Sequence, residues 1–475
     1  MKLKKYRLAD IGKVITGKTP STSIAENYAC GNIPFYTPED VAKGLGMMGR
    51  NNRFISQTGF EEIASNTISG ESVLVGCIGS DMGNVAYSNI TCATNQQINS
   101  ITQFKNGAEP LYVYYLLSTM KPYFQKIAGS TTTPILPKSV FEEIEIYLPG
   151  IKYQKDIVSI LYALDRKIAL NHQINDNLEA MAKQLYDYWF VQFDFPNEED
   201  KPYKSSGGAM VWNEKLKRKI PNGWTVETVG TYANCKSGYA IKSSDFKAKG
   251  IPVIKIGNIQ EDYTLNMNGC QYIENNTNKL FYVYQNDVVI AMTGATIGKF
   301  AIVPFSETGY FVNQRVGKFE LGNNPIKKMP YLINSLKIDY FRNQIFQLAS
   351  GCAQPNISVE QINNISLLYP STKILREYNM KCKWMYEQIA NCRYQIDVLT
   401  KLRDKLLPLL MNGQALVNYH LSVVNVVARL PFYRRLPIFM YCFILLLLSR
   451  LSWYNKNVRL QEMGDVIKGV IKEVA

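Results

Sequence analysis

The sequence contains one structural unit twice. The stretch GSTTTPILPKSVFEEIEIYLP occupies residues 129–149, and SGCAQPNISVEQINNISLLYP occupies residues 350–370. In each stretch a small polar run ends in a proline, and a short apolar segment is closed by another proline. The first of these prolines, Pro134 and Pro355, lie 221 positions apart, and so do the last. An internal repeat of this length constrains the architecture more than any other feature of the chain.

Other pairs keep the same order in both halves. Gly79 corresponds to Gly294 at an offset of 215, and the dipeptide that begins at Asn95 corresponds to the one at Asn313 at an offset of 218. The small differences between these offsets indicate short insertions in loops. The repeated segments are short, β-branched and punctuated by glycine, which predicts two mainly β heads. Each head is predicted to carry one amphipathic helix, within residues 110–128 and 329–349.

A different sequence pattern follows each head. From residue 153 to 190 and again from 378 to 411, apolar side chains recur at steps of three and four. This spacing predicts two long amphipathic helices with a coiled-coil-like seam, the first about 57 Å long at 1.5 Å per residue. The polar segment between the halves is rich in Gly, Pro and Ser and is predicted to be a linker.

The predicted fold class is therefore α+β, with an internal pseudo-two-fold repeat. Two mainly β heads are each followed by a long helix, and the two helices are expected to pack as an antiparallel coiled coil. Duplex DNA has two-fold axes of its own, so paired heads suit two half-sites. The predicted boundaries are heads at 1–150 and 222–370, helices at 151–190 and 371–412, a linker at 191–221 and a tail at 413–475.

Composition narrows the class of function. The formal charge of +14 favours a polyanion or an anionic membrane surface as partner. Nine cysteines without a CxxC pair indicate reduced thiols in a cytosolic protein, and two histidines exclude a histidine-rich metal site. The stretch TGATIGKF at 293–300 is a near miss to a phosphate-binding loop, because Phe300 stands where a hydroxyl is needed, and its glycines more simply shape a tight loop. GLGMMG at 44–49 lacks the strand and helix that a dinucleotide site requires.

The order of segments resembles the specificity subunit of type I restriction-modification systems, over residues 1 to about 413. LRDKLLPLLMNGQ at 402–414 is similar to the usual ending of that family, and IPNGWTVETVG at 220–230 is similar to the opening of its second domain. The resemblance implies two target recognition domains on double-stranded DNA and no catalytic role or cofactor in this chain. It implies that the long helices are spacers that dock modification subunits, expected as two copies, which use S-adenosylmethionine to methylate adenine. A separate restriction subunit uses ATP and magnesium.

Base readout needs hydrogen-bonding side chains on loops, and such side chains cluster at matching places in both heads. Arg315 beside Gln314 is the strongest candidate, since both side chains can bond a base edge bidentately. Ordinary turn chemistry is the alternative for each residue. Because the loops differ between heads, the two half-sites are predicted to differ. The predicted DNA-binding residues are Lys18, Thr19, Ser21, Thr22, Asn95, Gln96, Ser130, Thr131, Thr132, Lys242, Ser243, Thr293, Thr296, Lys299, Asn313, Gln314, Arg315, Gln354 and Asn356.

Aromatic residues gather at the end of the first long helix. They either pack in the core or dock a partner subunit, because such anchors carry interface energy. The predicted partner-binding residues are Leu185, Tyr186, Tyr188, Trp189 and Phe190, together with Leu406 and Leu410 on the second helix.

The tail does not fit the repeat. Its apolar run at 436–448 has thirteen residues, fewer than the roughly 20 of a membrane span, so a membrane partner is not expected and a cytoplasmic location is. Two other functions stay open: a membrane-tethered coiled-coil scaffold, and a stand-alone DNA-modifying enzyme. The sequence has no Pro-Pro-Tyr or Pro-Pro-Phe step, so the motif of amino-group DNA methyltransferases is missing. This absence argues against the stand-alone enzyme.

Overall fold

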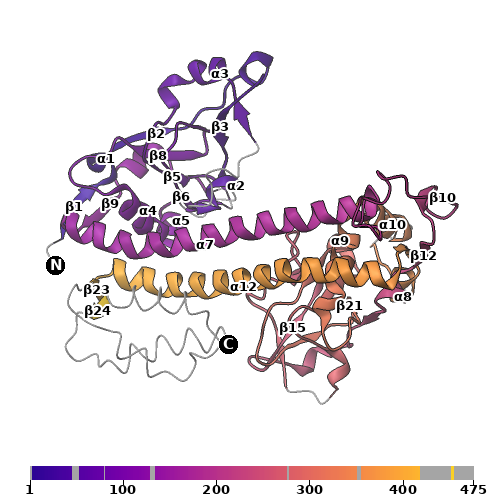
Figure 1. Cartoon of the computed structure of the whole chain (residues 1–475). Coiled ribbons are helices and arrows are strands. Elements are labelled where there is room, and N and C mark those ends of the chain that lie inside the picture. Colours follow the sequence, from indigo (N-terminus) through magenta and orange to yellow (C-terminus); the bar gives the residue numbers. More distant parts are fainter. Residues whose placement is uncertain are drawn as a thin grey trace. The chain divides into compact units, whose positions relative to one another are not determined.

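The computed structural model describes residues 3–44, 53–79, 81–128, 134–274, 278–349, 355–417 and 451–453. The chain divides into two compact units. Within the described ranges, unit 1 holds the residues up to 169 and those from 398 on, and unit 2 holds residues 170–397. Each long helix therefore contributes one part to each unit (Figure 1). The run at 436–448 lies outside the described residues.

The head in unit 1 is built on small sheets. A four-stranded antiparallel sheet has the order β2-β8-β5-β6, and a three-stranded sheet has the order β4-β3-β7, in which β3 and β7 run parallel. The first strand closes on the last as an antiparallel pair, β1 with β9. The strands are β1 (Lys4–Arg7), β2 (Lys13–Thr16), β3 (Ile33–Tyr36), β4 (Phe54–Ile55), β5 (Ser72–Gly76), β6 (Val85–Ser88), β7 (Ala93–Thr94), β8 (Ile98–Thr102) and β9 (Glu145–Leu148).

Short helices cover this head before the long helix begins. Strands β5, β6 and β8 are buried along their whole length, the polar residues Asn99, Ser100 and Thr102 of β8 included. The helices are α1 (Leu8–Ile11), α2 (Pro38–Val41), α3 (Gln57–Glu62), α4 (Pro110–Ser118), α5 (Lys121–Ile127), α6 (Lys138–Glu142) and α7 (Ile151–Tyr186).

The head in unit 2 repeats this topology. Its four-stranded sheet has the order β13-β21-β18-β19, its strands β15 and β20 run parallel, and β12 closes on β22. The strands are β12 (Thr225–Thr228), β13 (Cys235–Ser237), β14 (Phe246–Lys247), β15 (Ile251–Ile254), β16 (Tyr272–Ile273), β17 (Tyr282–Val283), β18 (Val288–Ala291), β19 (Phe300–Ile302), β20 (Tyr310–Val312), β21 (Val316–Phe319) and β22 (Ser366–Tyr369). The helices are α8 (Val229–Tyr232), α9 (Met329–Lys337), α10 (Asp339–Ala349), α11 (Val359–Asn363) and α12 (Thr372–Met411). The predicted internal repeat is thus confirmed in the four-stranded sheet, the parallel pair and the closing pair, whereas the second sheet of this head has five strands, in the order β14-β16-β15-β20-β17.

The prediction of a single amphipathic helix just before the repeated proline stretch is wrong in both heads, because two helices lie there. In unit 1, Pro122 lies in the first turn of α5, a position that favours a helix start over the continuation of α4. In unit 2, Ile338 has an extended backbone with φ −74° and ψ 146°, which separates α9 from α10. The apolar periodicity runs through both breaks, so it could not reveal them.

The two long helices exist as predicted, with 36 residues in α7 and 40 in α12. Within unit 2 they run antiparallel, because Asn171 donates to Gln395 at 3.2 Å whereas the hydroxyl of Tyr378 donates to the carbonyl oxygen of Ala182 at 3.4 Å. Helix α12 continues through Pro408 near its end. Whether the seam packs in the coiled-coil manner stays a prediction.

The segment predicted to be a linker is folded. Strands β10 (Met210–Asn213) and β11 (Arg218–Pro221) form a hairpin. The ring of Phe195 stacks on that of Trp224, and also on that of Tyr203, with centroids 4.7 Å apart in both pairs. Phe193, Phe195 and Trp224 therefore join the core of unit 2, whereas Trp212 is 56% exposed.

Strands β23 (Ala415–Val417) and β24 (Leu451–Trp453) pair antiparallel after α12. Within the described ranges, the search for a helix with the length and apolar character of a membrane span finds none.

Candidate nucleic-acid interface

Three loops of the first head are joined by backbone hydrogen bonds. The nitrogen of Gly79 donates to the carbonyl oxygen of Pro134 at 3.1 Å, which joins the glycine loop after β5 to the first repeated stretch. The nitrogen of Cys77 donates to the carbonyl oxygen of Gln97 at 2.8 Å, which joins the same loop to the turn after β7. The predicted candidates on these loops are therefore neighbours in space.

The second head contains the same bonds at the repeated positions. Gly294 donates to Pro355 at 2.9 Å, and Met292 donates to Arg315 at 3.0 Å. The offsets, 215 and 221 for the first bond and 215 and 218 for the second, are those of the sequence repeat. We call this arrangement the loop cluster: the loop after β2 or β13, the glycine loop after β5 or β18, the Asn-Gln turn after β7 or β20, and the repeated proline stretch.

The glycines of the cluster have left-handed backbones. The φ angles are +80° at Gly79 and +85° at Gly83, and +72° at Gly294 and +78° at Gly298. Glycine adopts this region without the steric cost that a Cβ brings. The tight-loop interpretation of TGATIGKF is confirmed, since its two glycines perform the same backbone task as the pair in the first head.

A further glycine brings the loop after β2 or β13 against the Asn-Gln turn. A Cβ on Gly17 would lie 2.3 Å from the carbonyl oxygen of Asn95, and one on Gly238 would lie 2.4 Å from that of Asn313. At these distances the two backbones touch, so only glycine fits. This contact places Lys18 and Thr19 beside the turn in the first head.

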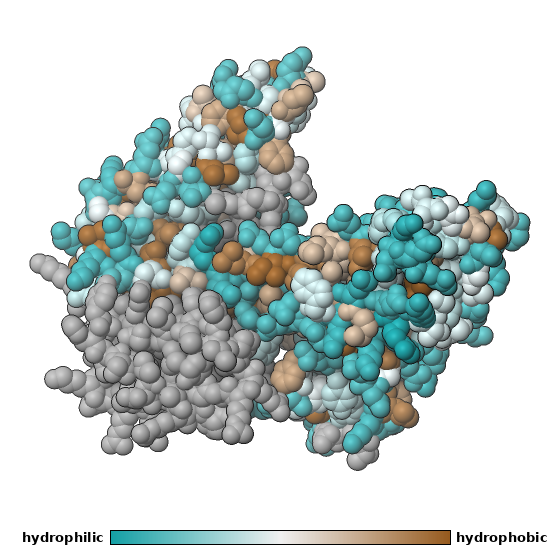
Figure 2. All heavy atoms as spheres, in the orientation of Figure 1, coloured by the Kyte–Doolittle hydropathy of each residue, from teal (hydrophilic) through white to brown (hydrophobic). Residues whose placement is uncertain are grey.

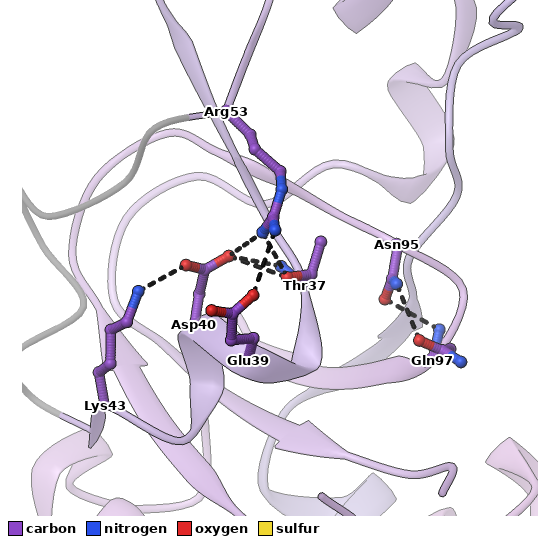
Figure 3. A network of polar contacts seen from close by, with 7 residues as sticks. All are labelled: Thr37, Glu39, Asp40, Lys43, Arg53, Asn95 and Gln97. Atoms are coloured by element: carbon purple, nitrogen blue, oxygen red, sulfur yellow. Dashed lines mark hydrogen bonds and ion pairs between the residues drawn. The ribbon is translucent and has the colours of Figure 1, made fainter. Parts of the chain in front are cut away.

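The asparagine of each turn has a structural task. The Oδ1 atom of Asn95 accepts a hydrogen bond from the nitrogen of Gln97 at 3.1 Å (Figure 3). The Oδ1 atom of Asn313 accepts one from the nitrogen of Arg315 at 3.3 Å. This is the turn chemistry that the sequence left open as an alternative. The glutamine that follows is exposed in both heads, and Arg315 is exposed as well.

Several other candidates are engaged within the chain. Thr19 donates to Gln96 at 2.8 Å, and the backbone nitrogen of Ser21 donates to Glu62 at 3.1 Å. Lys299 pairs with Glu261 at 3.1 Å, although that glutamate is 85% exposed. The Oγ1 atom of Thr293 is buried, and among the described residues it finds no hydrogen-bond partner.

The remaining candidates divide by exposure. The exposed residues are Lys18, Thr22, Lys242, Ser243 and Asn356, whereas Thr296 is partly buried. Asn356 forms an isolated backbone bridge with Thr293, which joins the proline stretch to the glycine loop. Ser130, Thr131, Thr132 and Gln354 lie outside the described residues.

Sequence analysis missed a polar network beside the cluster in the first head. The carboxylate of Asp40, whose side chain is 5% exposed, pairs with Lys43 at 3.0 Å and Arg53 at 3.2 Å (Figure 3). Arg53 also donates to the hydroxyl of Thr37 at 2.7 Å. Burial acts to raise the pKa of Asp40, but hydrogen bonds from the Thr37 backbone and from Lys43 outweigh it and lower that pKa. The sequence signal that could have revealed this network is Thr-Pro-Glu-Asp at residues 37–40, which is a typical helix start.

The second head has a different residue pair at this place. Positions 37 and 40 correspond to Lys255 and Asn258 at the offset of 218, and the nitrogen of Lys255 donates to Asn258 at 2.8 Å. The helix start is kept while its charges change. The ammonium group of Lys255 lies 4.1 Å from the centroid of the Phe246 ring.

Most of the predicted partner-binding side chains lie in the core of the chain. Tyr186, Trp189 and Phe190 are at most 4% exposed within unit 2, which is the core-packing alternative. Tyr188 is 37% exposed and Leu185 is partly buried. Leu406 and Leu410 are buried in unit 1.

The described part of the chain contains no group of three or more His, Cys, Asp or Glu side chains that could hold a metal ion. Two heads with one topology, one loop cluster each and different exposed side chains define a protein that carries two related recognition surfaces. Its charge of +14 suits a polyanion.

Comparison with known proteins agrees with this class. The family model of the type I restriction modification DNA specificity domain matches residues 2–180 and 221–377. The chain belongs to this family. It is a specificity subunit of a type I restriction-modification system, with two DNA specificity domains and no catalytic role of its own.

Relatives of similar length carry the same description. The MjaIX specificity subunit of Methanocaldococcus jannaschii is 28% identical, over 86% of this chain and 92% of the relative. The MjaVIII specificity subunit of the same organism is 24% identical over the same shares. The crystal structure of the S subunit from M. genitalium has a TM-score of 0.56 at 16% identity, covering 86% of this chain and 96% of that one, which shows a similar fold.

Proposed function

We propose that each head reads one half of a split, asymmetric DNA site through its loop cluster. The observation that carries this proposal is the repeated set of backbone hydrogen bonds with different side chains mounted on it. A fixed backbone holds donors and acceptors in register, and the exposed side chains determine which base edges they match. The cluster offers Lys18, Thr22 and Gln96 in the first head, and Lys242, Ser243, Gln314 and Arg315 in the second.

The charge of the exposed candidates also supports DNA as the ligand. Lys18, Lys242 and Arg315 project from the loop clusters, and none of them is buried. Cations next to neutral hydrogen-bonding groups serve both phosphate contacts and base readout. The guanidinium of Arg315 can bond the O6 and N7 atoms of a guanine together, which makes it the principal candidate for base recognition.

The domain boundaries follow the same proposal. The target recognition domains are assigned to residues 1–150 and 222–370, and the spacers to 151–190 and 371–412, with the folded connection at 191–221 between them. We infer that the spacers dock two modification subunits, which bind S-adenosylmethionine and methylate adenine, and that a restriction subunit brings ATP and magnesium. We also infer a cytoplasmic location, where these partners meet DNA.

Exposed apolar side chains on the first spacer support such docking. Leu170 and Ile174 of α7 are 43% and 41% exposed, and Figure 2 shows hydrophobic residues at the surface over this helix. Of the aromatic residues at the end of α7, Tyr188 is the one available to a partner. An apolar strip on a helix is typical of a surface that another helix covers.

The decisive experiment is methylome sequencing of the host with and without this chain. We expect N6-methyladenine to disappear at one split motif with unlike halves when the chain is deleted. Supplying the chain on a plasmid should restore the same motif. A motif with identical halves would contradict the asymmetric reading, and an unchanged methylome in cells that express all subunits would contradict the proposal as a whole.

A further inference from the structure

A cavity of about 290 Å³ lies in unit 2, where the end of α7, helix α10 and the hairpin β10–β11 meet. Figure 1 places the labels α10 and β10 next to the C-terminal end of α7. The hairpin belongs to the segment that the sequence had suggested was a linker. The side chains that matter here are Tyr186, Val191, Leu216, Arg218, Ser335 and Tyr340, which all line the cavity.

Arg218 is a partly buried cation that lines this cavity. Its guanidinium carbon lies 5.0 Å from the centroid of the Phe193 ring. Among the residues that the structure describes, no carboxylate forms an ion pair with it. Burial lowers the pKa of Arg218. The groups that oppose this shift are Tyr186 and Tyr331, and neither of them is a carboxylic acid. Arg218 therefore has an apolar neighbour and no counter-ion.

A cation in such a place is costly unless an anion joins it, because desolvation is not repaid by pairing. The neutral groups nearby already have partners of their own. The hydroxyl of Ser335 donates to the carbonyl oxygen of Tyr331 at 2.8 Å and lies 3.2 Å from the hydroxyl of Tyr186. The planar guanidinium fits a carboxylate through two parallel hydrogen bonds.

The surrounding charges favour the same ligand. The hairpin turn carries Lys215, Lys217 and Lys219, all exposed, against the single acid Glu214. Glu214 is itself paired with Lys217 at 3.0 Å. The positive field at the cavity attracts an acidic group and disfavours a basic one.

The rim shows what carries this acidic group. Val191 is 46% exposed and Tyr340 is 36% exposed at the cavity, and Tyr188, one helical turn before Val191, is 37% exposed. A free small acid that fills the cavity would leave Tyr188 uncovered. A polypeptide segment with an acidic residue next to an apolar one accounts for both the unpaired cation and the apolar rim.

We propose that this cavity is a docking site for an acidic-apolar segment of the modification subunit, with its carboxylate on Arg218 and its apolar side chain against Val191 and Tyr340. The inference rests on the proposed function, in which this subunit docks on the chain. It assigns a task to the hairpin β10–β11, which presents the arginine.

The test uses the full chain and the purified modification subunit, with affinity measured by calorimetry. Val191→Glu places a carboxylate at the mouth of the cavity, where it competes for Arg218, and Val191→Gln is the matched neutral control at the same exposed position. We expect Val191→Glu to weaken binding about ten-fold or more, which corresponds to roughly 1.4 kcal/mol, and Val191→Gln, which loses the apolar contact but adds no charge, to weaken binding clearly less than Val191→Glu.

Arg218→Met supplies a second, independent readout. It should weaken binding to a similar degree while leaving the melting temperature unchanged or raised, because it removes a buried cation that lacks a counter-ion. An arginine that merely stabilised the fold would show the opposite, a lower melting temperature with unchanged affinity, and that result would overturn the proposal.

The outcomes separate the cavity from the wider function. If the unchanged chain binds the modification subunit and Val191→Glu binds equally well, the cavity proposal fails while the proposed function stands. If the unchanged chain does not bind that subunit at all, the docking part of the proposed function fails first. If benzoate raises the melting temperature of the unchanged chain but not of Arg218→Met, and affinity for the subunit is unaffected, the site takes a small acid and the polypeptide occupant is wrong.

Discussion

Gly298 has a backbone conformation that disfavours every other residue type. Its φ is +78°, and a Cβ there would lie 2.9 Å from the Cγ2 atom of Ile345 in α10. We predict that Gly298→Ala lowers the free energy of unfolding by roughly 1–2 kcal/mol or more, since the left-handed conformation and the contact both add cost. Gly257→Ala is the control, because a Cβ there meets nothing within 4 Å. Urea unfolding measures both, and equal stabilities would contradict the account.

Asp40 should make the first head sensitive to acid. Hydrogen bonds and Lys43 outweigh burial and hold its pKa below the ordinary value of 3.8. A lowered folded-state pKa means that the stabilising contribution is complete above the unfolded-state pKa and is lost as the pH falls through the folded-state pKa. Thermal melting between pH 6 and pH 2 should therefore show a smaller loss of stability on acidification in Asp40→Asn than in the unchanged chain.

The control for this prediction is Glu39→Gln. Glu39 also pairs with Arg53, at 3.2 Å, but its side chain is 73% exposed, so water and salt screen the pair. We expect its melting curve to follow the unchanged chain at every pH. A matching loss of acid sensitivity in both variants would show that Asp40 has no special part in the acid response.

At single residues the sequence could predict loops but not the tasks of their side chains. Asn95 and Gln96 are adjacent and equally polar, yet Asn95 closes the turn and Gln96 is exposed. Only the backbone path distinguishes them, because an asparagine that accepts from the nitrogen two residues on looks the same in sequence as one that faces solvent. Arg218 went unnoticed for a related reason, since a lysine-rich hairpin reads as an ordinary solvated surface.

At the scale of elements, each head is attached to its long helix at an equivalent position by different chemistry. In unit 1 the hydroxyl of Tyr115, on α4, donates to Asp165 of α7 at 2.7 Å. In unit 2 the amide of Asn334, on α9, donates to the hydroxyl of Tyr386 on α12 at 2.9 Å. Residues 165 and 386 are 221 apart, the offset of the repeat. The position of the contact is thus repeated, whereas its ionic or neutral character is not.

The ionic contact in unit 1 should lose more stability on a single substitution than the neutral contact in unit 2. Asp165 is 7% exposed and also accepts from Arg403 at 2.8 Å. We predict that Asp165→Ala destabilises unit 1 by about 3–5 kcal/mol, since it leaves a partly buried guanidinium without its main counter-ion. Asp404→Ala, which removes an exposed partner of the same arginine, should cost less than about 1 kcal/mol. Denaturant unfolding of both variants checks this, and similar losses would refute the distinction.

The elements that the sequence predicted well are the ones with long periodic patterns. Helices of 36 and 40 residues repeat their apolar spacing often enough to be recognised. The helix pairs α4–α5 and α9–α10 and the hairpin β10–β11 were missed, because a break of one or two residues or a four-residue strand hardly changes such a pattern. In the folded connection, Phe195 and Trp224 find each other only through tertiary contact.

At the scale of the whole molecule, duplication separates framework from specificity. The offsets of 215, 218 and 221 are carried by glycines, prolines and turn asparagines, which set the backbone, and they reappear as equivalent hydrogen bonds in both heads. The side chains on this framework have diverged: Gln97 in one turn corresponds to Arg315 in the other. A chain built in this way can change what one head reads without changing how either head folds.

The last prediction follows from this independence. The double variant Gln314→Ala with Arg315→Ala removes two exposed side chains of the second loop cluster and leaves the structural Asn313 in place. We expect discrimination in one half of the methylated motif to fall by roughly 1–3 kcal/mol per lost bidentate contact, while the other half stays fully specified. Methylome sequencing of cells that carry the variant would show a motif relaxed on one side only.

Two controls keep that result specific. Arg342→Ala removes an exposed arginine of the same unit that lies on α10, outside the four segments of the loop cluster, and should leave the motif unchanged. Lys18→Ala with Gln96→Ala, in the first head, should relax the opposite half. The heads would not read separate half-sites if both double variants relaxed the same half, or if each relaxed both halves equally. The reason is that a side chain on one loop cluster can alter only the bases that its own cluster contacts.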